Sequence, residues 1–423
     1  MESAEIKFPL CADFCRIMKT NPQISQSQQE RVLNACAVML NQPKKCDVPQ
    51  RIAVSSVMVL LELGPINLSV LGSNLFKISS DAAQFFAHPP LVDGLINELD
   101  SADELLLLTL NKLIVADLHG FVRAVKKKRL NVLGQIRRGM ARIITESQNA
   151  SPAELKSFEK RMVLLLEASR QLVNVTELFA QVEQDGQFVA IWLHCIQTFI
   201  ESEHVIHLCA RLLSISTQSS EFCAALQCKG AGLPAGFSCD TSGYLCVWLS
   251  VFGNPGTERN WMLFVAQAIE RHMKQAHIVV RFLYAIGNGA AACKQCRHDK
   301  FVKTTRRVLA YYVKRGTGGN PPFFANSDLD LDVVLKAVRV CANFALEESG
   351  ANSIVAEDAL IKLHIKLFQM ILDEKAKFKE TDELLKYIIA ALNNIIYFSS
   401  IDFEKFASDV ASLFIKVGEM KKM

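Results

Sequence analysis

Glycine and proline are scarce in this sequence, which contains 20 glycines and 12 prolines among 423 residues. Both counts fall below the average usage of globular proteins. No run of alternating apolar and polar residues flanked by hairpin turns is found either, so a fold of many short strands is not expected. Because leucine, alanine, isoleucine and valine are plentiful, the chain is predicted to be almost entirely helical.

The sequence also lacks an apolar run of 18 or more residues. Its most apolar stretch, 52–72, is interrupted by Glu62 and Pro65, so no membrane-spanning helix is expected. The first residues show no basic start followed by an apolar core, and we expect no signal peptide. The 13 cysteines lie mostly in apolar stretches, which is typical of buried, reduced thiols. A cytoplasmic protein is predicted.

Signatures of catalysis are missing as well. Two glycine-containing segments, "GNGAAACK" and "RGTGGNPP", match neither phosphate-binding pattern, and no nucleophile elbow or pair of catalytic carboxylates is found. The formal net charge of +4 is too small to imply a nucleic-acid or membrane partner. We therefore expect a protein that is not an enzyme, with no cofactor and no small-molecule substrate.

Several helix starts are marked by capping residues. Ser101 is followed by Glu104, and Ser151 is followed by Pro152 and Glu154, which is the spacing of a capping box. Another helix is predicted to begin at or near Thr381. Apolar residues recur along it at helical spacing and share one face: Leu384, Leu385, Ile388, Ile389 and Leu392.

A small polar residue, usually asparagine, recurs near the end of apolar helical segments. These anchors are separated by seven steps, and four of the steps lie between 36 and 40 residues. An asparagine amide buried without partners costs about 1–3 kcal/mol, so each is predicted to hydrogen-bond a neighbouring repeat or the backbone of an extended ligand. The serine anchors are Ser214 and Ser250, and the predicted binding residues are Asn74, Asn111, Asn174, Asn288, Asn343, Asn393 and Asn394.

A period near 40 residues is typical of an armadillo or HEAT α-solenoid. We predict a single superhelix over 1–423 with roughly eight irregular repeats. The alternative is that a leucine-rich chain offers such anchors by chance. The predicted parts are an atypical helical cap at 1–60, irregular repeats at 61–270 with a long loop at 228–243, and the best-formed repeats at 271–423 with an insertion at 314–332.

The region 280–400 resembles armadillo repeats. The segment "VVLKAVRVCANFALEESGANSIVAEDALIKLHIKLF" follows the armadillo pattern, and "RFLYAIGNGAAACKQCRHDKF" and "AALNNIIYF" are similar to segments of a ciliary group of that family. Members of this group serve radial-spoke assembly in motile axonemes. The resemblance implies a protein–protein scaffold in a cilium or flagellum that binds radial-spoke or ciliary transport components in a concave groove.

Nuclear-import adaptors, another armadillo group, place a tryptophan four residues before each groove asparagine. The corresponding residues before Asn74, Asn288, Asn343 and Asn394 are not tryptophan, and Tyr284 is the only aromatic one. The sequence therefore does not resemble a receptor for nuclear-localisation signals. The four residues at these positions are Val70, Tyr284, Arg339 and Ala390.

The stretch 123–142 carries eight lysines and arginines and no acidic residue. A helix here would bury Val125, Leu130, Val132, Leu133 and Ile136 and expose a basic face. That face could attract phosphates, acidic protein tails or tubulin, although the stretch has no aromatic residue to stack on bases. The main alternative is an ordinary solvated face, and nucleic acid is not the expected partner. The predicted patch is Arg123, Lys126, Lys127, Lys128, Arg129, Arg137 and Arg138.

Two clusters have partial metal-ligand spacing. Cys293, Cys296 and His298 form half of a zinc site, and incidental thiols at a helix end are the stronger interpretation. His204 and His207 lie three residues apart without the glutamate of a metalloprotease motif. Ordinary histidines of a repeat helix are again the stronger interpretation. The residues near this second cluster are His194, Cys195 and Cys209.

Overall fold

The structure is a computed structural model in which every described element is a helix, and no strand occurs among the described residues. This confirms the all-α prediction for the part of the chain described. None of the helices described is long and apolar enough to cross a membrane. The described residues are 89–184, 187–219, 222–223, 261–292, 299–317, 328–373, 379–399 and 404–420.

Several predicted features lie outside the described residues. They are the cap at 1–60, Asn74, Ser250, the loop at 228–243, and the cluster of Cys293, Cys296 and His298.

The chain divides into two compact units, Met1–Phe179 and Ala180–Met423. In the first unit, α11 packs against both α8 and α10, and α9 packs against α7 and α8. Their shared core is apolar and includes Phe121, Leu133, Ile136, Met162 and Leu165. The elements are α7 (Pro89–Asn97), the 3-10 helix η2 (Leu99–Ser101), α8 (Glu104–Ala116), α9 (Leu118–Lys128), α10 (Val132–Ser147) and α11 (Pro152–Leu172); α12 (Thr176–Gln184) spans the boundary between the units.

The predicted capping box at Ser151 is confirmed. The Ser151 side chain accepts from the backbone N–H of Glu154, and the Glu154 carboxylate accepts from the backbone N–H of Ser151 at 2.8 Å. The box predicted at Ser101 is wrong. Asp103 caps α8 instead by accepting from the backbone N–H of Leu106 at 3.1 Å, since Ser101 lies in the preceding 3-10 turn.

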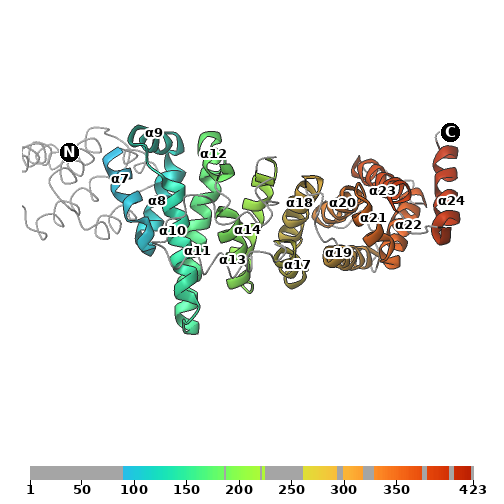
Figure 1. Cartoon of the computed structure of the whole chain (residues 1–423), viewed down its shortest axis with the longest axis horizontal. Coiled ribbons are helices and arrows are strands. Elements are labelled where there is room, and N and C mark those ends of the chain that lie inside the picture. The colour runs from blue at the N-terminus through green and yellow to red at the C-terminus, as the bar shows by residue number, and fades with distance from the viewer. Residues whose placement is uncertain are drawn as a thin grey trace, which may run out of the picture. The chain divides into compact units, whose positions relative to one another are not determined.

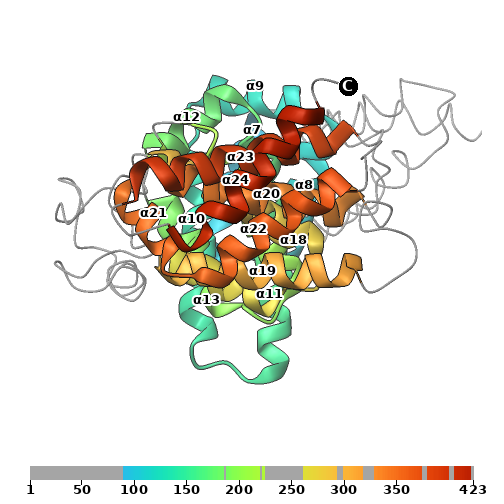
Figure 2. The same cartoon turned by 90° about the vertical axis from the view of Figure 1, so that its right-hand side faces the viewer.

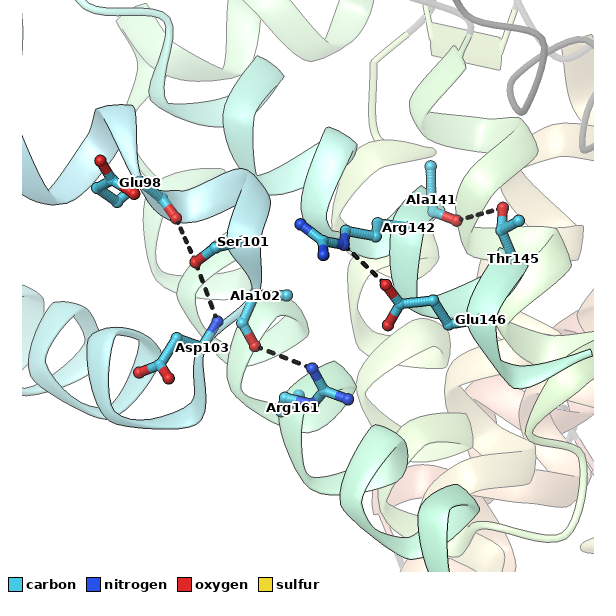
Figure 3. A network of polar contacts seen from close by, with 9 residues as sticks. All are labelled: Glu98, Ser101, Ala102, Asp103, Ala141, Arg142, Thr145, Glu146 and Arg161. Atoms are coloured by element: carbon cyan, nitrogen blue, oxygen red, sulfur yellow. Dashed lines mark hydrogen bonds and ion pairs between the residues drawn. The ribbon is translucent and has the colours of Figure 1, made fainter. Parts of the chain in front are cut away.

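That turn is held by α10 and α11 (Figure 3). The Ser101 hydroxyl donates to the Glu98 carbonyl at 2.7 Å, and the Arg161 guanidinium reaches the Ala102 carbonyl at 3.5 Å. Gly139 of α10 lies so close that a Cβ on it would stand 2.9 Å from the Leu99 carbonyl oxygen. A residue with a side chain would therefore force the turn and α10 apart.

The single basic helix predicted for 123–142 is wrong. The chain breaks between α9 and α10, where Arg129 adopts the left-handed conformation with φ of 52°. Asn131 then caps α10 by accepting from the backbone N–H of Gly134 at 2.8 Å. Val125, Val132 and Ile136 are buried as expected, but they belong to two helices whose main neighbours differ: α7 and α8 for α9, and α11 and η2 for α10.

The second unit contains two stacks of helices (Figure 1). We call α14, α18, α20 and α23 the ladder stack, because each contacts the next in that order. The companion stack consists of α13, α17, α19, α22 and α24, which contact one another in the same serial way. Figure 2 looks toward the end of the unit where α24 lies against α22. Helices far apart in sequence are therefore neighbours within each stack.

Two sequence-predicted boundaries fall in this unit. The helix predicted to begin near Thr381 begins at Lys379, and the predicted insertion at 314–332 is helical at both ends. The elements of the unit are α13 (Gln187–Thr198), α14 (Glu203–Ser216), α17 (Trp261–Arg271), α18 (Ala276–Ala292), α19 (Asp299–Thr317), α20 (Asp328–Phe344), α21 (Glu348–Val355), α22 (Asp358–Asp373), α23 (Lys379–Phe398) and α24 (Glu404–Met420).

Candidate functional site

Three of the ladder helices, α18, α20 and α23, are joined by asparagine side chains. Asn343 of α20 donates from Nδ2 to the carbonyl oxygen of Gly287 on α18 at 2.7 Å. Asn394 of α23 donates from Nδ2 to the carbonyl oxygen of Ala342 on α20 at 3.0 Å. Gly287 and Ala342 directly precede the asparagines of their own helices, Asn288 and Asn343. Each amide thus bonds the helix before it at an equivalent position.

The carbonyl oxygens of the neighbouring helices supply the hydrogen-bond acceptors that these half-buried amides need. Asn343 and Asn394 each hydrogen-bond a neighbouring helix, as expected if that helix belongs to the neighbouring repeat. In the first unit, Asn111 of α8 also reaches another helix, because its Nδ2 lies 2.9 Å from the carbonyl oxygen of Leu164 on α11.

The predicted binding residues Asn174 and Asn393 lie outside this series of hydrogen bonds between ladder helices. Asn174 lies beyond the end of α11 and bonds the Arg170 carbonyl within its own segment at 2.9 Å. Asn393 is exposed on α23, next to the half-buried Asn394. The structure therefore brings together Asn288, Asn343 and Asn394 and leaves Asn111, Asn174 and Asn393 elsewhere.

Charged and aromatic residues accompany the asparagines. Residues four, seven and eleven positions before a helical anchor lie on the same face of the helix. On α18 and α20, these positions place Tyr284 beside Arg339. We define the stripe as the residues of this face and its edge on three ladder helices: His207 and Arg211 of α14, Arg281 and Tyr284 of α18, and Lys336 and Arg339 of α20.

Contacts within the stripe confirm that its helices present these residues to one another. The Arg339 guanidinium lies 5.6 Å from the centre of the Tyr284 ring, and the Lys336 ammonium lies 5.9 Å from it. Arg339 also donates to Oδ1 of Asn288 at 3.4 Å. Both cations are within the range of cation–π attraction, so Tyr284 is the centre of the cluster.

At the α14 end of the stripe, His207 meets His277 of α18. The rings of His207 and His277 lie 5.0 Å apart, and His277 Nε2 lies 3.6 Å from a carboxylate oxygen of Glu203. The pKa of His207 is lowered to about 4, mainly because burial disfavours the charged ring. Electrostatic interactions with four neighbouring side chains lower it further: His277, Arg211, Arg281 and His204.

The predicted basic patch is split between α9 and α10. Lys126 pairs with Glu177 at 2.6 Å and lowers the pKa of that carboxyl, and Lys128 lies 3.8 Å from Asp93. Arg138 donates to the side chain of Gln135 at 3.1 Å. Arg137 is half-buried, whereas Arg123, Lys127 and Arg129 are exposed. The patch is therefore not one continuous helix face.

The second predicted metal cluster is also dispersed. His204 is exposed, while Cys209 is buried and its pKa is raised by burial and by Cys195. His194 is buried on α13. No group of three or more histidine, cysteine, aspartate or glutamate side chains among the described residues is arranged to hold a metal ion.

Sequence reasoning did not single out Arg281 or Lys336. Their common spacing of seven residues before Asn288 and Asn343 is a signal that could have found them. No protein-family model matches the sequence, and no curated protein is significantly similar to it. The partner is therefore inferred from the chemistry of the stripe and from the motifs described above.

Proposed function

We propose that the protein is a non-catalytic scaffold of the armadillo or HEAT type, whose ladder helices bind an extended segment of a partner protein. The observation that carries this proposal is the hydrogen bond from an asparagine side chain to a backbone carbonyl of the preceding ladder helix, which occurs twice. Asn343 and Asn394 each bond the carbonyl next to the previous anchor, which makes successive helices equivalent. Serial contact between equivalent helices is the organisation of solenoid proteins.

Equivalent helices suit a partner that is itself repetitive. An extended peptide presents side chains at a constant interval, so each ladder helix offers it a similar set of contacts. Tyr284 supplies apolar surface and a hydroxyl, while Arg281 supplies charge and is exposed. Residues of this kind are enriched in protein–protein interfaces.

The ciliary role follows from the resemblance. The two motifs similar to the ciliary armadillo group, 281–301 and 390–398, include parts of α18 and α23, which are two of the four ladder helices. We therefore propose that the partners are radial-spoke components or the ciliary transport machinery that carries them. The chain would act in the cytoplasm and at the axoneme.

The test is photo-crosslinking from defined positions in the full chain. A photoreactive phenylalanine analogue is placed at Tyr284 on the ladder stack, and the matched control carries it at Lys303, an exposed position on the companion helix α19. Each protein is expressed in its own cells, irradiated and analysed by mass spectrometry. We expect radial-spoke or ciliary transport proteins to be crosslinked from position 284 and not from 303.

Two results would contradict the proposal. Equal crosslinking from both positions, or none from position 284, would show that the ladder stack is not the binding surface. Crosslinking from position 284 to nuclear or ribosomal proteins would agree with the proposed scaffold function but contradict the proposed ciliary role.

A further inference from the structure

We propose that the stripe binds an acidic extended protein segment, whose carboxylates pair with Arg281, Lys336 and Arg339. The inference rests on the proposed function, because it specifies the chemistry of the partner that the ladder stack binds. It concerns a surface separate from the basic stretch 123–142.

The first support is the concentration of positive charge on two adjacent helices. Lys336 and Arg339 of α20 both approach the Tyr284 ring of α18, and Arg281 lies one turn before that ring on the same helix. The hydrogen bond that Arg339 makes to Asn288 goes to a neutral amide oxygen. Asp332, 3.5 Å from Lys336, offsets part of this charge. An incoming carboxylate would stabilise the positive charge that Arg281 and Arg339 add.

The positive potential continues onto α14. Arg211 lies on α14, which packs against α18, and both Arg211 and Arg281 lower the pKa of His207. The charge therefore extends over three consecutive ladder helices and is not confined to one pair. A segment with several acidic residues would contact it along its length.

Acidic residues near the N-terminal ends of three ladder helices, which we call the acidic edge, favour a peptide over a polynucleotide as the partner. Glu203, Asp332 and Glu383 occupy the position eleven residues before the anchors of α14, α20 and α23. Asp332 also lies 3.5 Å from Lys336. A polynucleotide carries a negative charge on every phosphate, and this edge would repel it. A peptide places acidic side chains only where its sequence provides them, so it can meet the cations and avoid the edge.

The dimensions of a peptide also fit. Adjacent packed helices are about 8–10 Å apart, and a segment in the polyproline II conformation advances about 3.1 Å per residue with every third side chain on the same side. Acidic residues spaced about three apart would therefore meet cations on successive helices. Tyr284 lies at the middle of the stripe, where it can contact the peptide between two carboxylates.

The experiment measures fluorescence anisotropy with the full chain and three labelled probes. They are a 13-residue peptide with glutamate at every third position and serine elsewhere, the same peptide with glutamine for glutamate, and a single-stranded oligothymidylate. The test variant is Arg281→Gln with Arg339→Gln. Its matched control, Arg123→Gln with Lys127→Gln on α9, removes the same charge from exposed positions elsewhere. Circular dichroism checks the helicity of both.

We expect the glutamate peptide to bind the wild type at least about tenfold more tightly than the glutamine peptide, and to weaken as salt is raised. The double stripe variant should lose at least about fivefold in affinity while the α9 control does not. Arg281→Gln alone changes an exposed side chain, and it should lose part of the affinity with the fold intact.

Equal binding of the glutamate and glutamine peptides, equal losses in the stripe variant and the α9 control, or tighter binding of the oligothymidylate would each overturn the inference. Absence of glutamate-peptide binding would overturn it as well. In any of these cases, a partner crosslinked from position 284 would leave the proposed scaffold standing. Loss of that crosslink would remove both proposals.

Discussion

Asn394 donates its amide proton to the carbonyl oxygen of Ala342, 3.0 Å away on the preceding ladder helix. Ala342 stands immediately before Asn343, which makes the equivalent bond to Gly287. An amide inside an apolar helix is thus explained by the neighbouring helix, without any ligand. Substitution of these asparagines is consequently a test of stability before it is a test of binding.

Replacing Asn394 by alanine should lower the free energy of unfolding by about 1 kcal/mol, since one hydrogen bond to a neighbouring helix is lost. Asn394→Asp should cost more, because a carboxylate would then face the Ala342 carbonyl oxygen. Chemical denaturation followed by circular dichroism measures both. The control is Asn393→Ala, at the exposed neighbouring position, which should change stability by less than about 0.5 kcal/mol. Equal effects at 393 and 394 would contradict the role of the bond.

Two glycine-to-alanine substitutions should change the free energy of unfolding in opposite directions. Gly139→Ala should destabilise the first unit by about 1–3 kcal/mol, because the new Cβ would stand 2.9 Å from the Leu99 carbonyl oxygen. Gly287→Ala should stabilise α18 by about 0.5–1 kcal/mol, because a Cβ there meets only ordinary contacts, the nearest to Val340 at 3.5 Å. Thermal unfolding of the two variants measures the difference, and a stabilising Gly139→Ala would refute the close approach.

Stability should fall on acidification because of His207. Its pKa is about 4 in the folded protein, against about 6.5 in an unfolded chain. Between these values the unfolded chain binds a proton that the folded chain does not, so the folded state loses stability as pH falls from about 6.5 to 4. The loss has an upper limit of about 3 kcal/mol.

The variant His207→Gln should remove this part of the pH dependence. Unfolding free energies of wild type and variant are compared at pH 7.5, 5.5 and 4.5. His204→Gln, at an exposed position on the same helix, is the control. If the stability difference between wild type and His207→Gln were the same at all three pH values, His207 would not be the titrating group.

Cys341 should be unreactive in the native protein. Its side chain is buried on α20, and burial raises the pKa of its thiol. The thiolate is the form that reacts with iodoacetamide, so labelling at pH 8 should be at least about tenfold slower in buffer than in denaturant. Mass spectrometry resolved by peptide gives the rate for this cysteine alone. Equal rates in buffer and denaturant would show that the α20 core opens freely.

Local features of the fold could be predicted from the sequence. Ser151, Pro152 and Glu154 mark the start of α11 because capping depends on residues within one turn of each other. The need of Asn343 and Asn394 for a partner could likewise be predicted, since a half-buried amide must be satisfied. The identity of the partner could not, because Gly287 lies 56 residues before Asn343.

The errors have a common origin in tertiary packing. Arg129 is neither glycine nor asparagine, so nothing local marks it as the left-handed residue that ends α9. The break lets α9 pack mainly against α7 and α8 while α10 packs mainly against α11 and η2. The stripe was missed for the same reason, since Tyr284 and Arg339 meet only when α18 and α20 are adjacent.

The asparagine bonds have a mechanical consequence. Asparagine bonds fasten α20 to α18 and α23 to α20 in series, so tension applied along these three helices is carried from one bond to the next. Elements that contact only their neighbours can yield one at a time. The bonds of Asn343 and Asn394 would then add to the apolar packing in resisting the separation of α20 from α18 and of α23 from α20, and the unit would lengthen in steps.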